Sequence, residues 1–483
     1  MSLYKDICIV GTALPGLIAG RLLQRKGAHV CFLEPLATQA FDPAGGEFFS
    51  GILIKPLMQR LGIHPQEMQK FTPLALPMQF ISPYRRINFF EALDQFALEI
   101  DREQHDEMFF QDMLKTEAKE DLLLFHQVYD RHIRVYEKKA LFGSQKRKVL
   151  NMPSSQKTHH AQSKRSVLSQ MNLRPLDDHF LSMLEMTFTC AVQERLSVGR
   201  ARLMQYLLRH KGYQSMFGLV SFKSMLISLL KEHGATFVPF KTLQDIEIKK
   251  HQVQSIKYTN PDPLSIGCSQ LIINGNSARC LKHLPSGDAG IKQITTPEIK
   301  KIGRKVYCLF KIKHAFLPEG IGSQGVIYPK KMAKELSDRR DRPRMLRYLI
   351  LTPKLDTDTH NLFMKLDPND ALIAVTYFDD IKGPPNHTRM MREIFERMQS
   401  LIPFFTDMHV TLMLRYDPLE ADDQGDLREG WLYSSTTKVK HDFWGESIST
   451  PYKNLWRVGE STFPALGLDG QILAGDQLAQ TLT

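Results

Sequence analysis

The stretch Asp6–Glu34, DICIVGTALPGLIAGRLLQRKGAHVCFLE, decides the fold that we predict for this chain. Ile7–Val10 is a short apolar run that predicts a buried parallel strand, and Leu17–Gln24 carries the periodicity of a helix. Gly27 ends that helix, and His29–Leu33 predicts a second strand. This order of elements predicts a βαβ unit at the start of the chain.

The turn between the first strand and the helix has the spacing of a dinucleotide-binding motif. Gly11 allows a tight turn, the small residue Ala13 lets a pyrophosphate approach, and Gly16 lets helix and strand pack closely. The helix N-terminus favours phosphate, and Glu34 at the end of the second strand can accept ribose hydroxyl protons while repelling a 2′-phosphate. The motif therefore favours FAD or NAD over NADP, although Ala13 replaces the usual second glycine and an ordinary βαβ turn is the alternative.

Composition limits the classes of protein that this chain can belong to. The 483 residues are 42% hydrophobic and 24% charged, which is enough for two or three globular domains. The net charge is +11, but no nucleic-acid motif accompanies the basic clusters, so we expect no nucleic-acid partner. The six cysteines have no paired spacing, which predicts buried reduced thiols and no metal site.

The sequence shows no signal peptide and no apolar run of about 18 residues. We therefore expect a cytoplasmic protein, either soluble or peripheral on a membrane. The segment 143–166 is polar and basic, which predicts a flexible loop that could contact anionic lipid. His159 and His160 within it are more simply solvated side chains than metal ligands.

The middle of the chain alternates helical and strand-like patterns. Helices are predicted at 53–61, over parts of 96–136 and 167–212, at 221–233 and at 388–402. Strands are predicted as a pair within 73–90, as a meander over 245–259, and at 268–276, 305–330, 344–353 and 371–378. No internal repeat is present.

The C-terminal segment NLWRVGESTFPALGLDGQILAGDQLAQTL carries the second strong signal. Leu455–Val458 predicts a strand that Gly459 and Glu460 end. A glycine- and proline-rich stretch follows, and a helix is expected to begin near Gly470 and to run to Leu482. This arrangement places a second helix N-terminus against a ligand, and an ordinary strand–loop–helix is the alternative.

Taken together, the two ends of the chain resemble the FAD-dependent amine oxidase and phytoene desaturase superfamily. The N-terminal motif of that family matches Gly11, Ala13, Gly16 and Glu34. Its C-terminal signature matches the segment from Gly459 through Gly475 and looks closest to carotenoid desaturases, carotenoid isomerases and retinol saturases. The segments FGLVSFKSMLISLLKEHGATFVPFKTLQDIEI, QLIINGNSARCLKHL and KVYCLFKIKHAF also resemble family elements.

The resemblance implies an α/β fold in which a Rossmann-like, NAD(P)-binding-like FAD domain is discontinuous in sequence. We expect residues 1–80, 205–290 and 445–483 to form that FAD-binding domain. Residues 81–204 and 291–444 would form an α+β substrate or cap domain. Residues 100–200 and 330–440 match no element that we can name.

The resemblance also implies where FAD would bind. Gly11–Gly16 would hold the pyrophosphate, Glu34 the adenosine ribose, and Leu243 would lie on the adenine side. Glu460 would reach the ribityl–pyrophosphate region, and the helix near Gly470 would face the flavin, where its N-terminus stabilises negative charge. The full set of expected cofactor-binding residues is Gly11, Thr12, Ala13, Leu14, Pro15, Gly16, Glu34, Leu243, Gly459, Glu460, Gly470, Gln471 and Ile472.

One departure weakens the expected cofactor binding. The family has an R-x-G-G-R loop soon after the acid of the second strand, and PAGGE at 43–47 is the only candidate here. Glu47 stands where the second arginine should be. We favour a deletion of the loop, because an anion near a pyrophosphate would weaken binding.

Three functions follow from these features. The first is an FAD-dependent oxidoreductase that desaturates, saturates or isomerises an apolar isoprenoid or carotenoid by hydride transfer at flavin N5. The second is an amine or amino-acid oxidase, whose superfamily members often place a lysine near N5; no lysine here carries a motif, and no catalytic acid or base can be assigned. The third is a catalytically silent, flavoprotein-like binding or assembly subunit. The sequence does not decide the oligomeric state.

Overall fold

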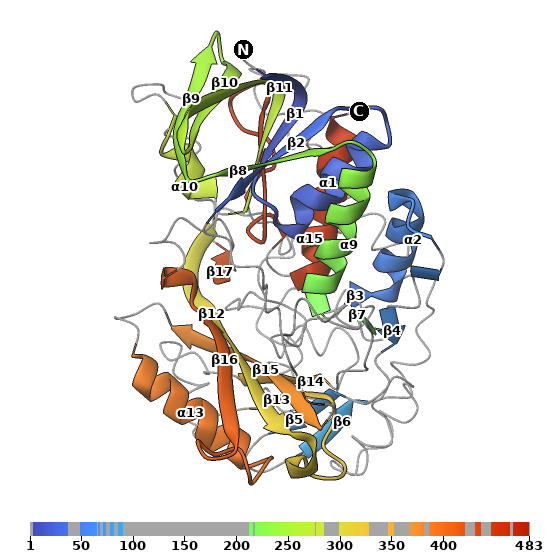
Figure 1. Ribbon diagram of the computed structural model, residues 1–483, viewed down its shortest axis with the longest axis vertical. Coiled ribbons are helices and arrows are strands. Elements are labelled where there is room, and N and C mark those ends of the chain that lie inside the picture. The colour runs from blue at the N-terminus through green and yellow to red at the C-terminus, as the bar shows by residue number, and fades with distance from the viewer. Residues whose placement is uncertain are drawn as a thin grey trace, which may run out of the picture.

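The computed structural model of the protein contains two large sheets, a small third sheet and the helices that pack on them (Figure 1). The described residues are 3–36, 49–64, 66–67, 71–73, 78–81, 86–89, 212–215, 218–275, 277–284, 299–327, 346–351, 367, 369–380, 386–420, 430–435, 446–463 and 467–482. The predicted loop at 143–166, the predicted helices between 96 and 212, and the PAGGE segment lie outside them.

The first sheet contains the predicted βαβ unit. Its strand order is β8-β2-β1-β11-β10-β9, and β18 pairs with β11. Strands β8, β2, β1, β11 and β18 run parallel, whereas β10 pairs antiparallel with both β9 and β11. The strands are β1 (Leu3–Val10), β2 (Val30–Pro35), β8 (Thr236–Phe240), β9 (Thr242–Lys249), β10 (Gln252–Asn260), β11 (Asp262–Asn274) and β18 (Leu455–Val458). Segments from both ends of the chain thus share one sheet, as expected.

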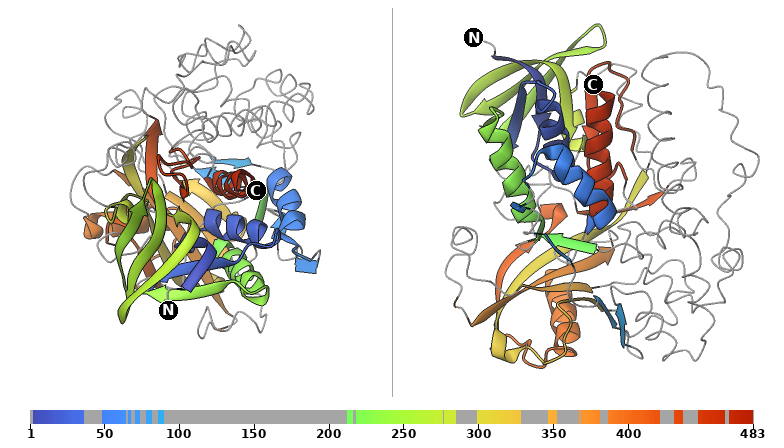
Figure 2. Two further views of the ribbon diagram at one scale, coloured as in Figure 1. Left: turned by 90° about the horizontal axis from the view of Figure 1, so that it is seen from above. Right: turned by 90° about the vertical axis from the view of Figure 1, so that its right-hand side faces the viewer.

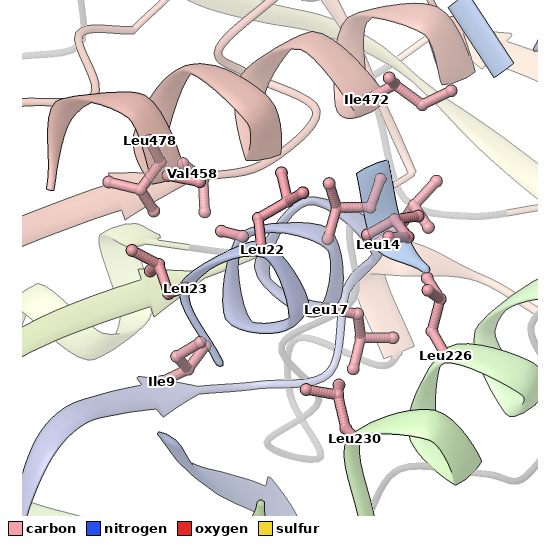
Figure 3. Packing of buried hydrophobic residues seen from close by; sticks show 14 of the residues in the cluster. Ile9, Leu14, Leu17, Leu22, Leu23, Leu226, Leu230, Val458, Ile472 and Leu478 are labelled. Carbon is pink, nitrogen blue, oxygen red and sulfur yellow. The ribbon is translucent and has the colours of Figure 1, made fainter. Parts of the chain in front are cut away.

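Three helices cover one face of this sheet: α1 (Leu14–Gln24), α9 (Gly218–Glu232) and α15 (Gly467–Thr481). Their apolar residues meet those of β1 and β18 in one core (Figure 3). Leu14 lies beside Ile472 and Leu22 beside Leu478, so α1 and α15 run in the same direction. Burial of this apolar face fixes both helices on the sheet.

On the other face of the first sheet, residues of β1 and β2 pack in a second core with residues of β9, β10 and α10 (Ser277–Leu281). Lys250 and His251 connect β9 to β10 with φ angles of 50° and 58°, which is the backbone of a type I′ hairpin turn. The alternating pattern that predicted this hairpin is confirmed in its register, in which Ile256 pairs with Ile246.

The second sheet has the order β16-β12-β15-β14-β13-β5-β6, with β17 also paired to β12. Its strands are β5 (Met78–Ile81), β6 (Arg86–Phe89), β12 (Ile299–Lys313), β13 (Gln324–Ile327), β14 (Leu346–Leu351), β15 (Asp370–Asp380), β16 (Val410–Tyr416) and β17 (Trp431–Ser435). Helix α13 (His387–Gln399) packs on one face through Met390, Ile394 and Met398. Figure 2 shows α13 beyond this sheet, on the far side from α1, α9 and α15. The opposite face of the sheet is therefore turned toward the first sheet and its helices.

The remaining elements are short. Helix α2 (Gly51–Leu61) packs beside α1 and α15, the 3-10 helix η3 (His314–Phe316) follows β12, and a small sheet joins β3 (Phe49–Ser50), β7 (Gly212–Ser215) and β4 (Phe71–Pro73). Among the described residues, no helix is both long and apolar enough to cross a membrane. The boundaries that we predict between the two domains stay a prediction.

Candidate functional site

The dinucleotide turn lies at the carboxyl end of β1, where the motif places it. Gly11 has a φ of 96°, a conformation that favours glycine, and its N–H donates to the Leu33 carbonyl at 2.8 Å. Ala13 is the N-cap of α1, with extended backbone angles and no side chain that could cap the helix. The chain therefore turns sharply from β1 into α1 beside the end of β2.

The Asn274 side chain, at the end of β11, holds this turn. Its Nδ2 donates to the carbonyls of Gly11 at 3.0 Å and Ala13 at 2.9 Å, and its Oδ1 accepts from the Gly16 N–H at 3.0 Å. A Cβ on Gly16 would lie 2.2 Å from Asn274 Nδ2. Residue 16 must therefore lack a side chain, because the Asn274 amide occupies that space. The same amide connects the end of β11 to the turn after β1, two segments that are far apart in sequence.

The first turn of α1 offers fewer N–H donors than the motif suggests. Pro15 has no N–H, the Gly16 N–H is used by Asn274, and the Leu17 N–H donates to the Ala13 carbonyl at 3.2 Å. Within the described part of the chain, the Leu14 N–H has no such acceptor. A phosphate at this helix would therefore bind the Leu14 N–H, together with the backbone of the preceding turn.

Glu34 stands at the end of β2 with a partly exposed side chain, as a ribose-binding acid requires. Leu243 lies on β9, at the other end of the strand order from β2, and is buried in the core beneath the meander. The chain passes from β8 into β9 close to the end of β2, because the Leu36 N–H donates to the Phe240 carbonyl at 2.8 Å. The contact that we expect between Leu243 and adenine stays a prediction.

The loop after β18 is held by its own side chains. The Gly459 N–H donates to Thr462 Oγ1 at 3.2 Å, and the Thr462 N–H returns to the Gly459 carbonyl at 3.2 Å. Ser461 Oγ donates to Glu446 Oε2 at 3.0 Å. These bonds fix the loop on both sides of Glu460 and leave its carboxylate directed away from them.

Glu460 connects the two sheets. Both of its carboxylate oxygens lie 3.5 Å from the Nζ of Lys305 on β12, and Gln471 Nε2 donates to Oε1 at 3.4 Å. The Lys305 side chain is 1% exposed and that of Glu460 is 18% exposed. Removal of one partner of a buried ion pair leaves the other charge buried and uncompensated, which strongly destabilises a protein. Lys305 and Glu460 therefore hold each other in position.

Helix α15 begins at Gly467, three residues before the predicted start near Gly470. Asp469 in the first turn supplies the reason, since a carboxylate there interacts favourably with the helix dipole. Gly470 and Gln471 therefore lie at the end of the first turn of α15 and the beginning of its second turn. Ile472 packs in the core beside Leu14, so its side chain belongs to the helix–helix contact.

The two helix N-termini are offset along the same direction. A Cβ on Gly475 would lie 2.4 Å from the Pro15 carbonyl oxygen, so Gly475 of α15 packs directly on the first turn of α1. Gly475 is eight residues beyond the start of α15 and Pro15 is one residue beyond the start of α1. At about 1.5 Å per residue, α15 therefore begins about 10 Å beyond α1. Two helix N-termini offset in this way suit an elongated dinucleotide.

Lys305 is the functional candidate that sequence reasoning did not identify. It is the one lysine that is fully buried among the described residues, and its backbone N–H donates to the Gly430 carbonyl at 2.7 Å. The strand KVYCLFKIKHAF was expected to begin the substrate domain, but its lysines could not be told apart. No local signal could have found it, because β12 also contains Lys300, Lys301, Arg304, Lys311 and Lys313.

The residues at this site fit FAD on the observations above. The turn at Gly11–Gly16 would hold the pyrophosphate, Glu34 the ribose, and the start of α15 the flavin end. The fit is weakest at the pyrophosphate, where α1 offers the single N–H of Leu14. Among the described residues, no group of three or more His, Cys, Asp and Glu side chains could hold a metal ion.

Comparisons with solved structures support the same fold. A putrescine oxidase variant has a TM-score of 0.57 at 11% identity, with 100% of this chain and 99% of that chain covered. An oxidoreductase from Methanosarcina mazei has a TM-score of 0.55 at 11% identity, with 98% and 100% covered. A RAB GDI from Plasmodium falciparum has a TM-score of 0.53 at 13% identity, with 100% and 98% covered.

No protein-family model matches the sequence, and no curated protein matches it. At these identities, the structural likeness establishes the architecture of the chain and leaves its chemistry to be argued from the site. The expected α/β fold with a Rossmann-like sheet and a second sheet is confirmed. The chain therefore shares its fold with putrescine oxidase, the Methanosarcina mazei oxidoreductase and RAB GDI.

Proposed function

We propose that the protein is an FAD-dependent oxidoreductase whose reaction takes place between the start of α15 and the inner face of the second sheet. The buried ion pair of Lys305 and Glu460 carries this proposal. It joins the substrate-type sheet to the loop and helix that would hold the flavin end of the cofactor. Bound FAD would supply hydride acceptance or donation at its N5 atom.

The chain's own residues would prepare this site in three ways. Asn274 keeps the dinucleotide turn rigid, Glu460 holds the Lys305 ammonium at a fixed position, and both sheets exclude water from that ammonium. A positioned, nearly buried ammonium can bind a water or a substrate heteroatom and move a proton at its Nζ. The burial and pairing of Lys305 support it as the proton-handling group, which the sequence did not identify.

Two substrate classes are supported by different observations. The apolar isoprenoid or carotenoid class is supported by the aliphatic side chains on the inner face of the second sheet, Leu309, Leu349, Leu372 and Ala374. The amine class is supported by Lys305 and by two tyrosines of the same face. Tyr307 lies two residues along β12 from Lys305 and pairs with Tyr416 of β16; both are buried, and their ring centroids are 6.0 Å apart. Peripheral contact with a membrane belongs to the isoprenoid or carotenoid alternative. The basic segment 143–166 that would make this contact lies outside the described residues.

The decisive experiment is spectroscopic. The purified full chain, reconstituted with FAD, should be yellow and show the visible bands of oxidised flavin. Anaerobic addition of polyenes or of amines should then bleach those bands with the class that the enzyme uses. A colourless protein that cannot be reconstituted would contradict the proposal and favour a silent binding or assembly subunit.

Lys305→Met tests the role of the ion pair, and Lys311→Met is its matched control. Both lysines lie on β12 and point to the same face, but Lys311 pairs with Asp370 at 3.8 Å rather than with Glu460. Lys305→Met should slow flavin reduction by about 10²-fold or more, the scale of general acid–base catalysis, while Lys311→Met should not. Equal rates in both variants would remove Lys305 from the reaction.

A further inference from the structure

The inner face of the second sheet carries several buried polar side chains. Val306 and Cys308 of β12 pack in the α13 core, so Lys305 and Tyr307 point to the opposite face, because successive side chains of a strand alternate. The same alternation identifies the residues of the neighbouring strands that share the face with Lys305. Among them is an arginine.

Arg347 of β14 lies on this inner face near Lys305. The register pairs Lys305 with Phe378 across β12 and β15, and it pairs Thr376, two residues before Phe378, with Arg347. Arg347 is 4% exposed, and its guanidinium carbon lies 5.3 Å from the centroid of the Phe378 ring. The guanidinium thus extends along the sheet toward the row that contains Lys305.

The spacing of the two cations follows from the sheet. Arg347 and Lys305 are separated by two strands and by two residues along them. With about 4.8 Å between strands and about 3.3 Å per residue, their Cα atoms are about 12 Å apart. Because both side chains are long and lie over Phe378 or beside it, a small molecule can contact both.

Gln324 of β13 is an independent sign of a polar ligand. It pairs with Leu349, so it shares the inner face and is a diagonal neighbour of Arg347. It is 2% exposed, and neither its Oε1 nor its Nε2 has a hydrogen-bond partner among the described residues. A buried amide without a partner is costly and is retained in native proteins for a reason, such as a ligand.

An apolar row lies between these polar groups. Leu309, Ala374 and Leu349 pair with one another across three strands, and Gln324 ends the row. The face therefore offers an ammonium and a guanidinium at the end nearest Glu460, aliphatic side chains next to them, and one amide beyond. This pattern matches a ligand with an anionic group, an apolar body and a further polar atom.

We propose that the substrate carries a carboxylate held by Arg347, with its apolar body on the Leu309–Ala374–Leu349 row and a polar atom at Gln324. The planar guanidinium suits a carboxylate because it can donate two parallel hydrogen bonds. This inference rests on the proposed function, in which the reacting carbon lies beside Lys305. It narrows both substrate classes to members with an acidic group near that carbon.

Calorimetric titration of the purified full chain with hexanoate and with hexanamide tests this proposal, because the two probes differ in charge and share an apolar body. We expect hexanoate to bind about tenfold more tightly or better, the scale of a charge-assisted hydrogen bond. Arg347→Gln should abolish that preference. Arg392→Gln, which changes an arginine on the exposed surface of α13, should keep it.

Arg347→Lys keeps the positive charge without the two parallel donors, and it replaces Arg347→Gln in the titration if that variant does not fold. It should lose part of the preference for hexanoate. A wild-type protein that binds both probes equally, or a preference that survives in the Arg347 variants, would overturn the proposal. Flavin absorbance is read from the same samples. A colourless protein with Arg347-dependent hexanoate binding contradicts only the flavin function, and a yellow protein without the preference contradicts only this inference.

Discussion

Replacement of Gly16 by alanine should destabilise the protein through one identifiable contact. The new Cβ would lie 2.2 Å from Nδ2 and 2.3 Å from Cγ of Asn274, which is far inside van der Waals contact. Asn274 is fully buried and makes three hydrogen bonds, to Gly11, Ala13 and Gly16. Either the amide moves and loses these bonds, or α1 moves away from β11.

The expected loss of stability is the sum of two free-energy costs, one for overpacking and one for lost hydrogen bonds. Overpacking of a well-packed core costs about 1–3 kcal/mol. A buried donor or acceptor left unsatisfied costs about 1–3 kcal/mol more, and here the amide serves three backbone groups. We therefore expect Gly16→Ala to lower the free energy of unfolding by about 3 kcal/mol or more. For a domain of about 200 residues this lowers Tm by roughly 6–12 °C.

Differential scanning fluorimetry of a double-mutant cycle checks the reasoning. Gly16→Ala and Asn274→Ala should each destabilise, but the double variant should be less destabilised than their sum, because removal of the amide removes the clash. Gly267→Ala is the control, since the nearest atom to its Cβ belongs to the exposed Tyr4 side chain, which can move. Additive effects of Gly16→Ala and Asn274→Ala, or a loss at Gly16 no larger than at Gly267, would refute the account.

Three further predictions concern the cofactor, the thiols and pH. Glu34→Gln should weaken FAD binding by about tenfold or more, measured by equilibrium dialysis, because it removes a charged hydrogen-bond acceptor for the ribose; unchanged affinity would place the ribose elsewhere. Burial raises the pKa of the Cys280 and Cys308 thiols to about 12. Mass spectrometry after iodoacetamide treatment at pH 8 should therefore find both unmodified until the protein is unfolded, and rapid labelling would contradict their burial. Hydrogen bonds from the His29 backbone and ring lower the pKa of Asp6. Asp6 therefore stabilises the fold above the pKa of an unfolded carboxyl, and this contribution is lost as the pH falls through its folded pKa. Asp6→Asn should lower Tm at pH 7, and this difference should shrink as the pH falls below the pKa of an unfolded carboxyl; a difference that does not change on acidification would be inconsistent with this linkage.

Much of the architecture could be predicted from the sequence because its signals are local. The strand, turn and helix of Asp6–Glu34, the hairpin of β9 and β10, and the strand Leu455–Val458 all lie where periodicity and turn residues put them. The start of α15 was placed three residues late, because the glycines near 470 were taken as the loop. A glycine in the first turn of a helix looks the same in sequence as a glycine of the preceding loop, and Gly467 is such a residue.

The charged site could not be predicted in the same way. Lys305 is one of several lysines in a basic stretch, and nothing local distinguishes it from Lys311 or Lys313. Its distinction comes from Glu460, which lies 155 residues away and meets it only after the two sheets have packed together. Because the pair is shielded from water, loss of one partner would strongly destabilise the protein, whereas an exposed pair of the same residues would contribute little to stability.

The sequence by itself determined that a dinucleotide turn begins the chain and that its C-terminal segment returns to the same sheet. Glycine, a small residue and an acid at fixed spacing are local requirements of the backbone, and they can be recognised without a fold. Only the tertiary structure decided which groups complete the site. The contacts of Asn274 with Gly11, Ala13 and Gly16, the pairing of Lys305 with Glu460 and the burial of Arg347 all depend on how distant segments are brought together.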